Sequence, residues 1–222
     1  MKMFSSLLGL IAPDTCVGCG IEGATLCGDC AGQLYWPDQC YKCRAMSKGG
    51  ITCAKCTPKT KLVAVFFAAA YVGSGKLAVG RAKYRPSSSA AAQLGKILAS
   101  KLPYLTSDTV VVHIPTTPSR ILERGFDQSA VIAQSVAKAK KLMHVSALHR
   151  LTKSHQVGSD RDSRILHMKN AFEVKNQSAV HGKTVVLVDD VVTTGATLES
   201  AAAVVYAAGA SRIIGAIFSR AP

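Results

Sequence analysis

No cysteine follows Cys56 in this 222-residue sequence, and no apolar run approaches the roughly 20 residues that a helix needs to span a bilayer. Low-complexity tracts are also absent, and no internal repeat stands out beyond the cysteine pairs near the start. The missing apolar run excludes insertion into a membrane as a helix. Cysteine pairs confined to one short region suit a reducing cytoplasm, with bound metal in place of disulfides.

The first residues carry little to mark them as an export signal. Met1–Pro13 holds one lysine and a short apolar run, Leu7–Ile11, but it lacks a small-residue cleavage site and leads directly to Cys16. We therefore expect an apolar arm that packs on the folded body of a cytoplasmic protein.

Acidic residues are scarce, since 13 Asp and Glu stand against 27 Lys and Arg, a formal net charge of +14. Residues 1–61 hold 7 basic and 4 acidic residues, a charge of +3, whereas residues 62–222 hold 20 and 9, a charge of +11. Eight zinc-bound thiolates would make the first segment negative, so the basic excess belongs to the second. This excess favours either a soluble basic surface or a polyanionic partner.

The composition also changes near residue 61. Residues 1–61 contain all the cysteines and end in a short basic linker, Thr57–Lys61. The remainder is rich in Ala, Val and Leu, enough to bury a core of its own. We predict two domains, an apolar arm with a zinc-binding region over residues 1–61 and a larger α/β domain over residues 62–222.

Each cysteine pair has the spacing Cys-x-x-Cys, which places two thiolates on one tight turn, able to bind a tetrahedral zinc ion. The pairs are Cys16 and Cys19, Cys27 and Cys30, Cys40 and Cys43, and Cys53 and Cys56. Sequential pairing gives one site from the first four cysteines and a second from the last four; the spacing does not exclude interleaved pairing. We predict two structural zinc ions, with an iron–sulfur centre or redox dithiols as alternatives. Four thiolate ligands leave no position for a catalytic water.

The stretch 184–200 combines a buried strand with polar chemistry. Thr184–Val188 has no polar interruption beyond its first residue, the pattern of a central parallel strand covered by helices on both faces. Asp189 and Asp190 then stand where this strand is expected to end. A turn of small and hydroxyl residues, Thr193–Thr197, precedes a helix predicted over Leu198–Ala208.

The remaining apolar patterns complete an α/β sheet. Further strands are predicted over Val63–Val72, at the sheet edge, over Thr109–Ile114 and over Ser211–Ser219. Helices are predicted over Gly73–Arg85, over Ala90–Lys101 with Ser89 as its cap, and over Ser129–Lys141. His113 is interpreted as a satisfied polar group at a strand end.

Two basic segments follow strands. The segment 115–128 is predicted to be a rigid loop that carries Arg120 and Arg124, whose guanidinium groups can each bind two phosphate oxygens; a solvated turn with a helix cap is the alternative. Leu148–Phe172 is predicted to be a mobile basic flap with a short helix from Asp160 to Met168. The Gly182-Lys183-Thr184 triplet is not a P-loop, because Gln177 stands where a glycine is required and a strand follows the triplet.

The turn over residues 193–197 suits a phosphate monoester. Its free backbone N–H groups, its hydroxyls and the positive end of the helix all favour an anion, and Gly195 allows close approach of the backbone. Asp189 and Asp190 can accept hydrogen bonds from ribose hydroxyls, directly or around Mg²⁺. The alternative is that the two carboxylates merely end a strand and cap a turn.

The run Val186–Leu198, which contains Asp189, Asp190 and the turn Thr193–Thr197, resembles the phosphoribosyl-pyrophosphate motif of type I phosphoribosyltransferases. Together with the eight cysteines before it, the chain is similar to the ComF/GntX family of competence-associated proteins. Further matching positions are Lys83-Tyr84, Pro115, Arg120, Arg124-Gly125-Phe126, Gln128, Gln156, Arg164 and Asn170-Ala171-Phe172. Asp127 and His167 depart from the family pattern, in which asparagine is usual.

This resemblance implies a type I phosphoribosyltransferase-like twisted parallel sheet with helices on both faces and a small hood, preceded by a small zinc-ribbon domain. It implies that the 5′-phosphate of phosphoribosyl pyrophosphate binds Thr193–Thr197, that the ribose binds Asp189 and Asp190 with Mg²⁺, and that pyrophosphate lies near Arg120, Arg124 and Lys83. No general base can be singled out. Asp127 adds a negative charge beside the expected pyrophosphate loop.

Two functions of different classes fit these features. The first is a phosphoribosyltransferase-fold protein that binds Mg²⁺-phosphoribosyl pyrophosphate and single-stranded DNA and acts in DNA uptake and natural transformation. The second is a catalytically active phosphoribosyltransferase of nucleotide metabolism, which transfers phosphoribosyl to a nitrogen nucleophile and releases pyrophosphate. A zinc-stabilised scaffold for a helicase partner of DNA import is a third interpretation.

Overall fold

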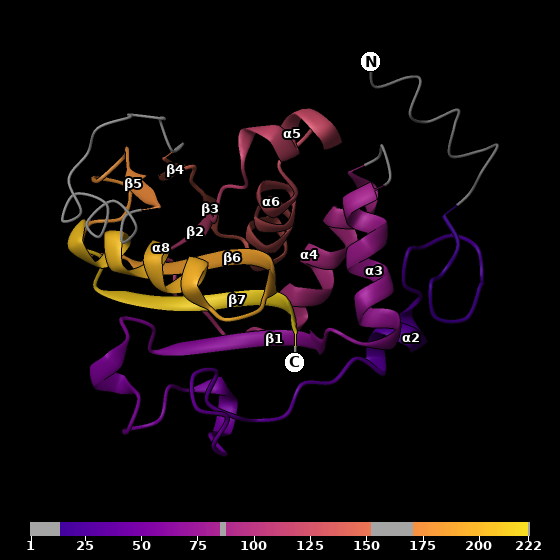
Figure 1. Ribbon diagram of the computed structural model, residues 1–222, viewed down its shortest axis with the longest axis horizontal. Coiled ribbons are helices and arrows are strands. Elements are labelled where there is room, and N and C mark those ends of the chain that lie inside the picture. The colour runs from indigo at the N-terminus through magenta and orange to yellow at the C-terminus, as the bar shows by residue number, and fades with distance from the viewer. Residues whose placement is uncertain (1–13, 85–87, 152–170, 222) are drawn as a thin grey trace, which may run out of the picture.

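The computed structural model describes residues 14–84, 88–151 and 171–221 (Figure 1). Several sequence predictions lie outside these residues: the apolar arm Met1–Pro13, most of the basic flap with its helix Asp160–Met168, and the matching positions Gln156, Arg164, His167 and Asn170. Within the described part of the chain, no helix combines the length and the apolar character needed to cross a membrane.

Five parallel strands form the central sheet, in the order β1-β7-β6-β2-β3. Strand β6 is the middle strand and β1 lies at an edge, as the sequence predicts. Their bounds are β1 Ala64–Ala70, β2 Thr109–His113, β3 Met143–His144, β6 Thr184–Val192 and β7 Arg212–Arg220. The short edge strand β3 was not predicted. Two further short strands, β4 Leu148–Arg150 and β5 Phe172–Val174, pair antiparallel beside the sheet and form the hood.

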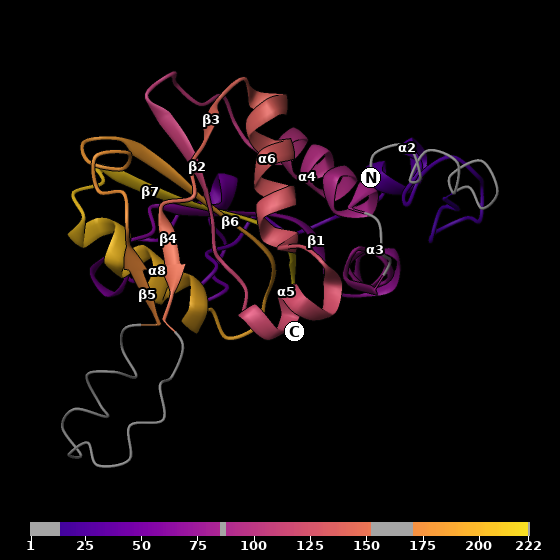
Figure 2. The same cartoon turned by 90° about the horizontal axis from the view of Figure 1, so that it is seen from above.

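Helices cover both faces of the sheet, which confirms the predicted fold class (Figures 1 and 2). Helices α3 Gly73–Tyr84, α4 Ser89–Lys101 and α6 Gln128–Lys140 pack on one face, and α8 Ala196–Ala207 packs on the other. Shorter helices are α2 Gly28–Gly32, η1 Lys48–Gly50, η2 Thr57–Lys59 and α5 Pro118–Arg124.

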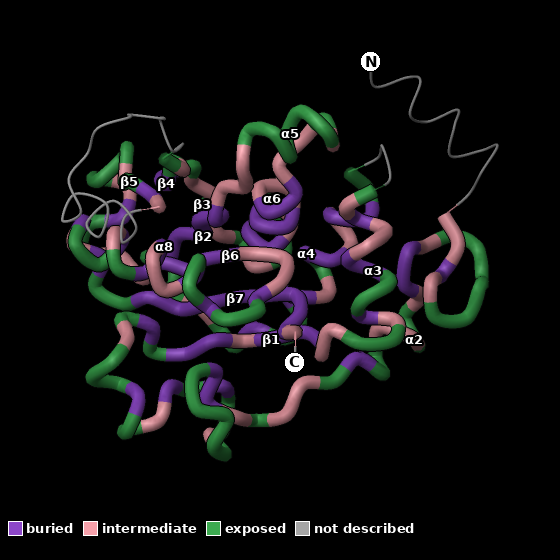
Figure 3. Tube along the Cα trace, in the orientation of Figure 1, coloured by how far each residue is buried: buried purple, intermediate pink, exposed green. Residues whose placement is uncertain are grey.

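Strand β6 is apolar along its first half because both of its faces are buried. Val186 and Val188 contact the core beneath α4 and α6, whereas Val185 and Leu187 contact the core beneath α8. All four side chains are fully buried, and the sheet is buried along most of its length (Figure 3). An uninterrupted apolar run is therefore required in this strand.

A crevice opens between β2 and β6, where the direction of the chain connections reverses. The crossover from β2 to β3 runs through α6 on one face, and that from β6 to β7 runs through α8 on the other. Open α/β sheets bind ligands at such a switch point, outside the carboxyl ends of the strands. Here β2 leaves the sheet after His113, which pairs with Val188, while β6 continues beside β7 as far as Val192.

The structure corrects two boundaries around this crevice. Strand β6 does not end before the acid pair, because pairing with β7 carries it through Asp189 and Asp190 to Val192. Helix α8 begins at Ala196 and not at Leu198, because Gly195 adopts a left-handed conformation with φ of 84° and turns the chain directly into the helix.

Two further predictions were wrong in detail. The segment after β2 contains a helix, α5, and is not a simple loop; Pro118 at its first position favours this start, and Gly125, with φ of 79°, ends it. The cap of α4 is Ser88 and not Ser89, and its side chain makes no capping hydrogen bond.

His113 is a satisfied polar group at the end of β2, as predicted. Its Nδ1 lies 3.0 Å from Nε2 of His144 on β3. Burial lowers the pKa of both imidazoles, so both rings are held neutral. This pair faces the sheet edge and takes no part in the crevice.

Candidate functional site

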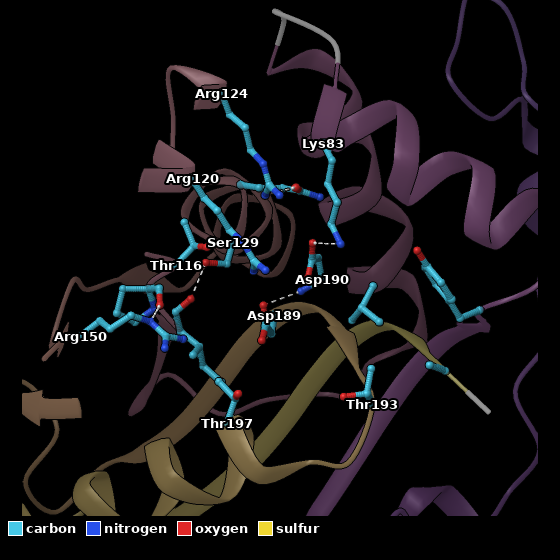
Figure 4. Close-up of a pocket in the computed structure, with 16 residues that line it drawn as sticks. Lys83, Thr116, Arg120, Arg124, Ser129, Arg150, Asp189, Asp190, Thr193 and Thr197 are labelled. Atoms are coloured by element: carbon cyan, nitrogen blue, oxygen red, sulfur yellow. Dashed lines mark hydrogen bonds and ion pairs between the residues drawn. The ribbon is translucent and has the colours of Figure 1, made fainter. Parts of the chain in front are cut away.

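A cavity of about 360 Å³ lies at the carboxyl ends of β2 and β6, below α5 (Figure 4). Most of its lining is polar or charged and comes from the segments that follow strands β1, β2, β6 and β7. The lining residues are Tyr71, Lys83, Ile114, Pro115, Thr116, Arg120, Arg124, Gln128, Ser129, Arg150, Asp189, Asp190, Val191, Thr193, Thr197 and Ala221.

The acid pair forms the floor of the cavity. Asp190 Oδ2 lies 3.2 Å from Lys83 Nζ, and Asp189 Oδ1 accepts a hydrogen bond of 2.8 Å from the backbone N–H of Asp190. Burial, followed by the charge of Asp190, raises the pKa of Asp189 well above its usual range. A cation or a hydroxyl donor at this carboxylate would stabilise its ionised form. Two carboxylates beside the hydroxyls of Thr193 and Thr197 are hard oxygen ligands that suit Mg²⁺.

Four cationic side chains lie around the acid pair. Figure 4 shows Arg120, Arg124 and Lys83 pointing toward it from α5 and α3. Arg124 donates to Gln128 Oε1 at 3.2 Å, and its Nε is buried without a partner among the described residues. The free guanidinium hydrogens can bind an anion that enters the cavity.

The fourth cation, Arg150 on β4, was not singled out in the sequence, where it was grouped with the basic flap. Its Nε donates to the Pro115 carbonyl at 2.9 Å, and its guanidinium lies 4.7 Å from the centre of the Phe172 ring. These contacts aim the side chain into the cavity. The pairing of β4 with β5 across a long sequence separation creates this placement, and the local sequence does not reveal it.

A smaller cavity of about 40 Å³ adjoins the acid pair and is lined by the phosphate loop, which we define as residues 193–197. Thr194, Gly195 and Ala196 line this smaller cavity, while Thr193 and Thr197 line both. The loop leads into the first turn of α8, whose backbone N–H groups have no partners inside the helix. Such a helix start attracts anions.

Asp127 has a structural role that its sequence position did not suggest. Its Oδ1 accepts hydrogen bonds from the backbone N–H groups of Ser129 and Ala130 and caps α6, and its Oδ2 accepts one of 3.0 Å from the Thr116 N–H. The carboxylate thereby fixes the Thr116 segment against α6. These three backbone N–H donors compensate part of the negative charge of the Asp127 carboxylate.

The cysteines form two groups of four with sequential pairing. The first cluster comprises Cys16, Cys19, Cys27 and Cys30, and the second comprises Cys40, Cys43, Cys53 and Cys56, with the sulfur atoms of each within 4.8 Å of one another. Sulfurs at 2.3 Å from a tetrahedral zinc ion stand about 3.8 Å apart. Cys19 and Cys27 have their sulfurs 3.6 Å apart, and Cys43 and Cys53 have theirs 3.5 Å apart. Both clusters fit zinc.

The backbone around Cys16 favours its thiolate. The Cys27 N–H lies 3.3 Å from Cys16 Sγ, and this contact leads those that lower the pKa of Cys16 to about 6. Hydrogen bonds with Cys27 and Cys16 raise the pKa of Cys30 in the same cluster to about 12, so zinc binding would release thiol protons. A Cβ on Gly18 would lie 2.6 Å from Cys30 Sγ, so a glycine suits this position.

We expect the purified protein to contain two zinc ions per chain. Removing them with a chelator should lower the melting temperature markedly, because structural zinc sites contribute directly to folding free energy. Elemental analysis and a thermal melt before and after chelation would check this. A metal-free protein with an unchanged melting temperature would contradict it.

Residues 88–222 match the phosphoribosyl transferase domain. The chain belongs to the phosphoribosyl transferase domain family. This family domain contains α4, α5, α6, β6 and the phosphate loop, so it includes most of the cavity wall.

One curated relative of the chain is Competence protein ComFC of Bacillus subtilis (strain 168). The two sequences are 37% identical over 93 residues, which make up 42% of this chain and 36% of ComFC. DNA utilization protein YhgH of Salmonella typhi is 27% identical over 177 residues, 73% of this chain and 75% of that protein. The resemblance to the ComF/GntX family is thus confirmed. The match spans only about a third of the length of ComFC.

Solved structures with a similar chain trace include one described as the allosteric regulatory enzyme of purine biosynthesis. It has 22% sequence identity and a TM-score of 0.44, with 57% of this chain and 25% of that chain covered. A glutamine phosphoribosylpyrophosphate amidotransferase from B. subtilis has a TM-score of 0.43 at the same identity and coverage.

Proposed function

We propose that the cavity binds Mg²⁺-phosphoribosyl pyrophosphate. The single observation that carries this proposal is the lining of one cavity by an acid pair, a phosphate loop and four cations. The 5′-phosphate would accept hydrogen bonds from the N–H groups and hydroxyls of the phosphate loop. The ribose hydroxyls would donate to Asp189 and Asp190, directly or around Mg²⁺.

The pyrophosphate would bind between α5 and α3. Arg120, Arg124 and Arg150 offer planar guanidinium groups that suit paired phosphate oxygens, and Lys83 offers a mobile ammonium group. With the two aspartates ionised, these four cations give the cavity a formal charge of +2. A polyanionic ligand, and not a neutral sugar, is the chemistry that this charge favours.

Transfer of the phosphoribosyl group is the alternative function. In that reaction a nitrogen nucleophile forms a bond to ribose C1 while the bond from C1 to the pyrophosphate oxygen breaks, and the electron pair leaves with pyrophosphate. Arg120 and Arg124 would stabilise the charge that develops on the leaving group. Bound Mg²⁺ supplies further neutralisation of that charge.

Calorimetry with Mg²⁺-phosphoribosyl pyrophosphate tests the binding proposal and carries a pH prediction. Asp189 binds its ligand as a carboxylate, and its pKa is raised, so affinity should fall as the pH is lowered through that pKa. Binding should then release a proton, seen as a heat that depends on the ionisation enthalpy of the buffer. Failure of the donor to bind at any pH from 6 to 8 rules out the proposal.

Binding and turnover are separated by a second measurement. Pyrophosphate release is followed with the sugar donor and a panel of bases and amines. Release that depends on one acceptor supports the transferase, whereas saturable binding without release across the panel supports a binding function.

A second function, handling of single-stranded DNA during DNA uptake, is favoured by a different surface. The amino-edge patch, which we define as Lys61, Lys183, Arg212 and Tyr206, lies where β1, β6 and β7 begin. Lys183 precedes Thr184, which pairs with Arg212, and Lys61 lies 4.3 Å from the centre of the Tyr206 ring. Among the described residues, none of these three cations has a carboxylate partner.

Cations beside an exposed aromatic ring are the features that bind single strands. The names of the relatives, a competence protein and a DNA utilization protein, support the same interpretation. Six residue steps along β6, from Lys183 to Asp189, at about 3.3 Å per residue separate the patch from the cavity by roughly 20 Å. The protein could therefore hold DNA and sugar donor at once, which fluorescence anisotropy with a labelled single strand would test.

Two further interpretations remain proposals. The eight unpaired cysteines suit a reducing cytoplasm, where the zinc ligands stay intact. A helicase partner of DNA import would be recognised by co-purification with the full chain.

A further inference from the structure

The turn between Cys40 and Cys43 lies directly beneath the phosphate loop. Tyr41 in this turn is 3% exposed, and its ring is so close to the loop that a Cβ on Gly195 would lie 3.9 Å from Tyr41 Cε2. The backbone carbonyl of Tyr41 accepts a hydrogen bond from the Arg220 guanidinium. Arg220 pairs in the sheet with Val192, the residue immediately before the loop. Tyr41 is therefore tied to the start of the loop.

The end of the loop is tied to the same turn through Glu199, in the first turn of α8. The Tyr41 hydroxyl donates to Glu199 Oε1, and Lys42 Nζ lies 2.5 Å from the same oxygen. Thr60 Oγ1 donates to Glu199 Oε2 at 2.8 Å. Tyr41 and Lys42 stand between two cysteines of the second cluster, and Thr60 follows its last cysteine closely. Both ends of this metal-binding segment thus converge on one carboxylate.

Glu199 stands where a bound phosphate would be repelled by a free carboxylate, although an acidic residue in the first turn stabilises a helix. Three donors, one of them cationic, offset its charge. These three contacts indicate that the Glu199 carboxylate attaches α8 and the phosphate loop to the second cluster.

The first cluster is attached elsewhere. Its Leu26 is buried against the helices on the opposite face of the sheet, and the backbone N–H and C=O of Leu26 each bond the Gln93 amide on α4 at 2.9 Å. Figure 1 shows this segment beside α3, whereas the second cluster lies below β1. Among the described residues, no hydrogen bond or ion pair joins the first cluster to residues 193–199.

We propose that Tyr41 and Glu199 are positioning residues of the phosphate loop, and that metal binding by the second cluster holds the loop in its phosphate-binding shape. The first cluster has no part in this. The expected effect on ligand binding rests on the proposed function, but the link between metal and loop does not.

Hydrogen exchange of the full chain tests the link without any ligand. Cys43 and Cys19 are each exposed within their clusters, so Cys43→Ser and Cys19→Ser form a matched pair. In Cys43→Ser we expect amide exchange in residues 193–199 to accelerate by about tenfold or more, as local opening becomes easier. In Cys19→Ser the same amides should stay near their original rates. Equal responses in the two variants, or no response, would overturn the proposal.

Variants that keep all eight cysteines guard against simple unfolding. Each should retain two zinc ions by elemental analysis, and each is titrated with ribose 5-phosphate. We expect Glu199→Ala to bind about tenfold more weakly, the loss of one hydrogen bond to a charged group. Glu199→Gln keeps an acceptor for the Tyr41 hydroxyl and should recover most of this loss, and Tyr41→Phe should resemble Glu199→Ala.

The sign of the change decides between positioning and plain electrostatics. If Glu199 acted only through its charge, removing it would strengthen phosphate binding, so tighter binding by Glu199→Ala overturns the proposal. If the unaltered protein binds no ribose 5-phosphate, the proposed function fails, while the exchange measurement still decides whether the second cluster holds the loop.

Discussion

Replacing Asp189 and Asp190 together with asparagine is expected to weaken Mg²⁺-dependent binding of phosphoribosyl pyrophosphate by at least about 100-fold. Each carboxylate would contribute a hydrogen bond to a charged group, worth about 1.5–3 kcal/mol, and about 1.4 kcal/mol corresponds to a tenfold change in affinity. The loss of both also removes the oxygen ligands that suit Mg²⁺. Calorimetry with the Mg²⁺-loaded donor measures this.

The same substitution is expected to make the ligand-free protein more stable. Because the pKa of Asp189 is raised in the folded state, the folded protein binds more protons than the unfolded chain between the two pKa values, and stability falls as the pH rises through that window. Asparagine removes this cost and the repulsion between the two carboxylates, so we expect a higher melting temperature even though the ion pair of Asp190 with Lys83 is lost.

A matched control removes two exposed carboxylates that do not line the cavity. Asp108→Asn with Glu173→Gln changes the net charge equally at exposed positions, and donor affinity should stay unchanged. Undiminished donor binding by the double asparagine variant would show that the acid pair is not the sugar site. A lower melting temperature would instead mean that the pair is structural.

Reversing the charge of the amino-edge patch is expected to remove most of the affinity for single-stranded DNA. Each phosphate contact contributes a slope of about −0.7 to the dependence of log affinity on log salt for single strands. The variant Lys61→Glu, Lys183→Glu, Arg212→Glu should therefore lower the slope by about 2 and weaken binding at low salt by roughly 100-fold. Fluorescence anisotropy at 50 to 200 mM salt measures both quantities.

The control for this variant reverses three exposed lysines on the helical side of the molecule, Lys76, Lys96 and Lys138. Its net charge changes equally, so a loss of DNA affinity common to both variants would point to diffuse attraction by the whole basic protein. Donor binding at the cavity should persist in both, because the patch lies at the opposite end of the strands.

The sequence could predict the features that depend on a short run of consecutive residues. The unbroken apolar run Val185–Val188 requires a central strand, and the acid pair with its hydroxyl-rich turn marks the carboxyl end of that strand, where the cavity lies. Cysteine spacing indicated two zinc sites but left their pairing open, since only the folded chain brings the sulfurs of Cys16 and Cys30 together.

The features that were missed depend on distant contacts or on competing signals. Arg150 reaches the cavity because β4 pairs with β5 and Pro115 accepts its Nε hydrogen. The attachment of Tyr41 to Glu199 joins segments with no local pattern in common. The short helix α5 had visible signals in Pro118 and Gly125, but these residues also suit a loop, and a seven-residue helix gives too little periodicity to decide.

The attachment of the two cysteine clusters to opposite faces of the sheet also bears on biosynthesis. The cysteine segments precede the strands that support them, so zinc can bind them while those strands are still being made. Leu26 and Tyr41 have no buried environment until α4, α8 and β7 have folded. Strand β7 supplies Arg220, which donates to the Tyr41 carbonyl. The second cluster therefore cannot join the sheet and the phosphate loop before β7 has been synthesised.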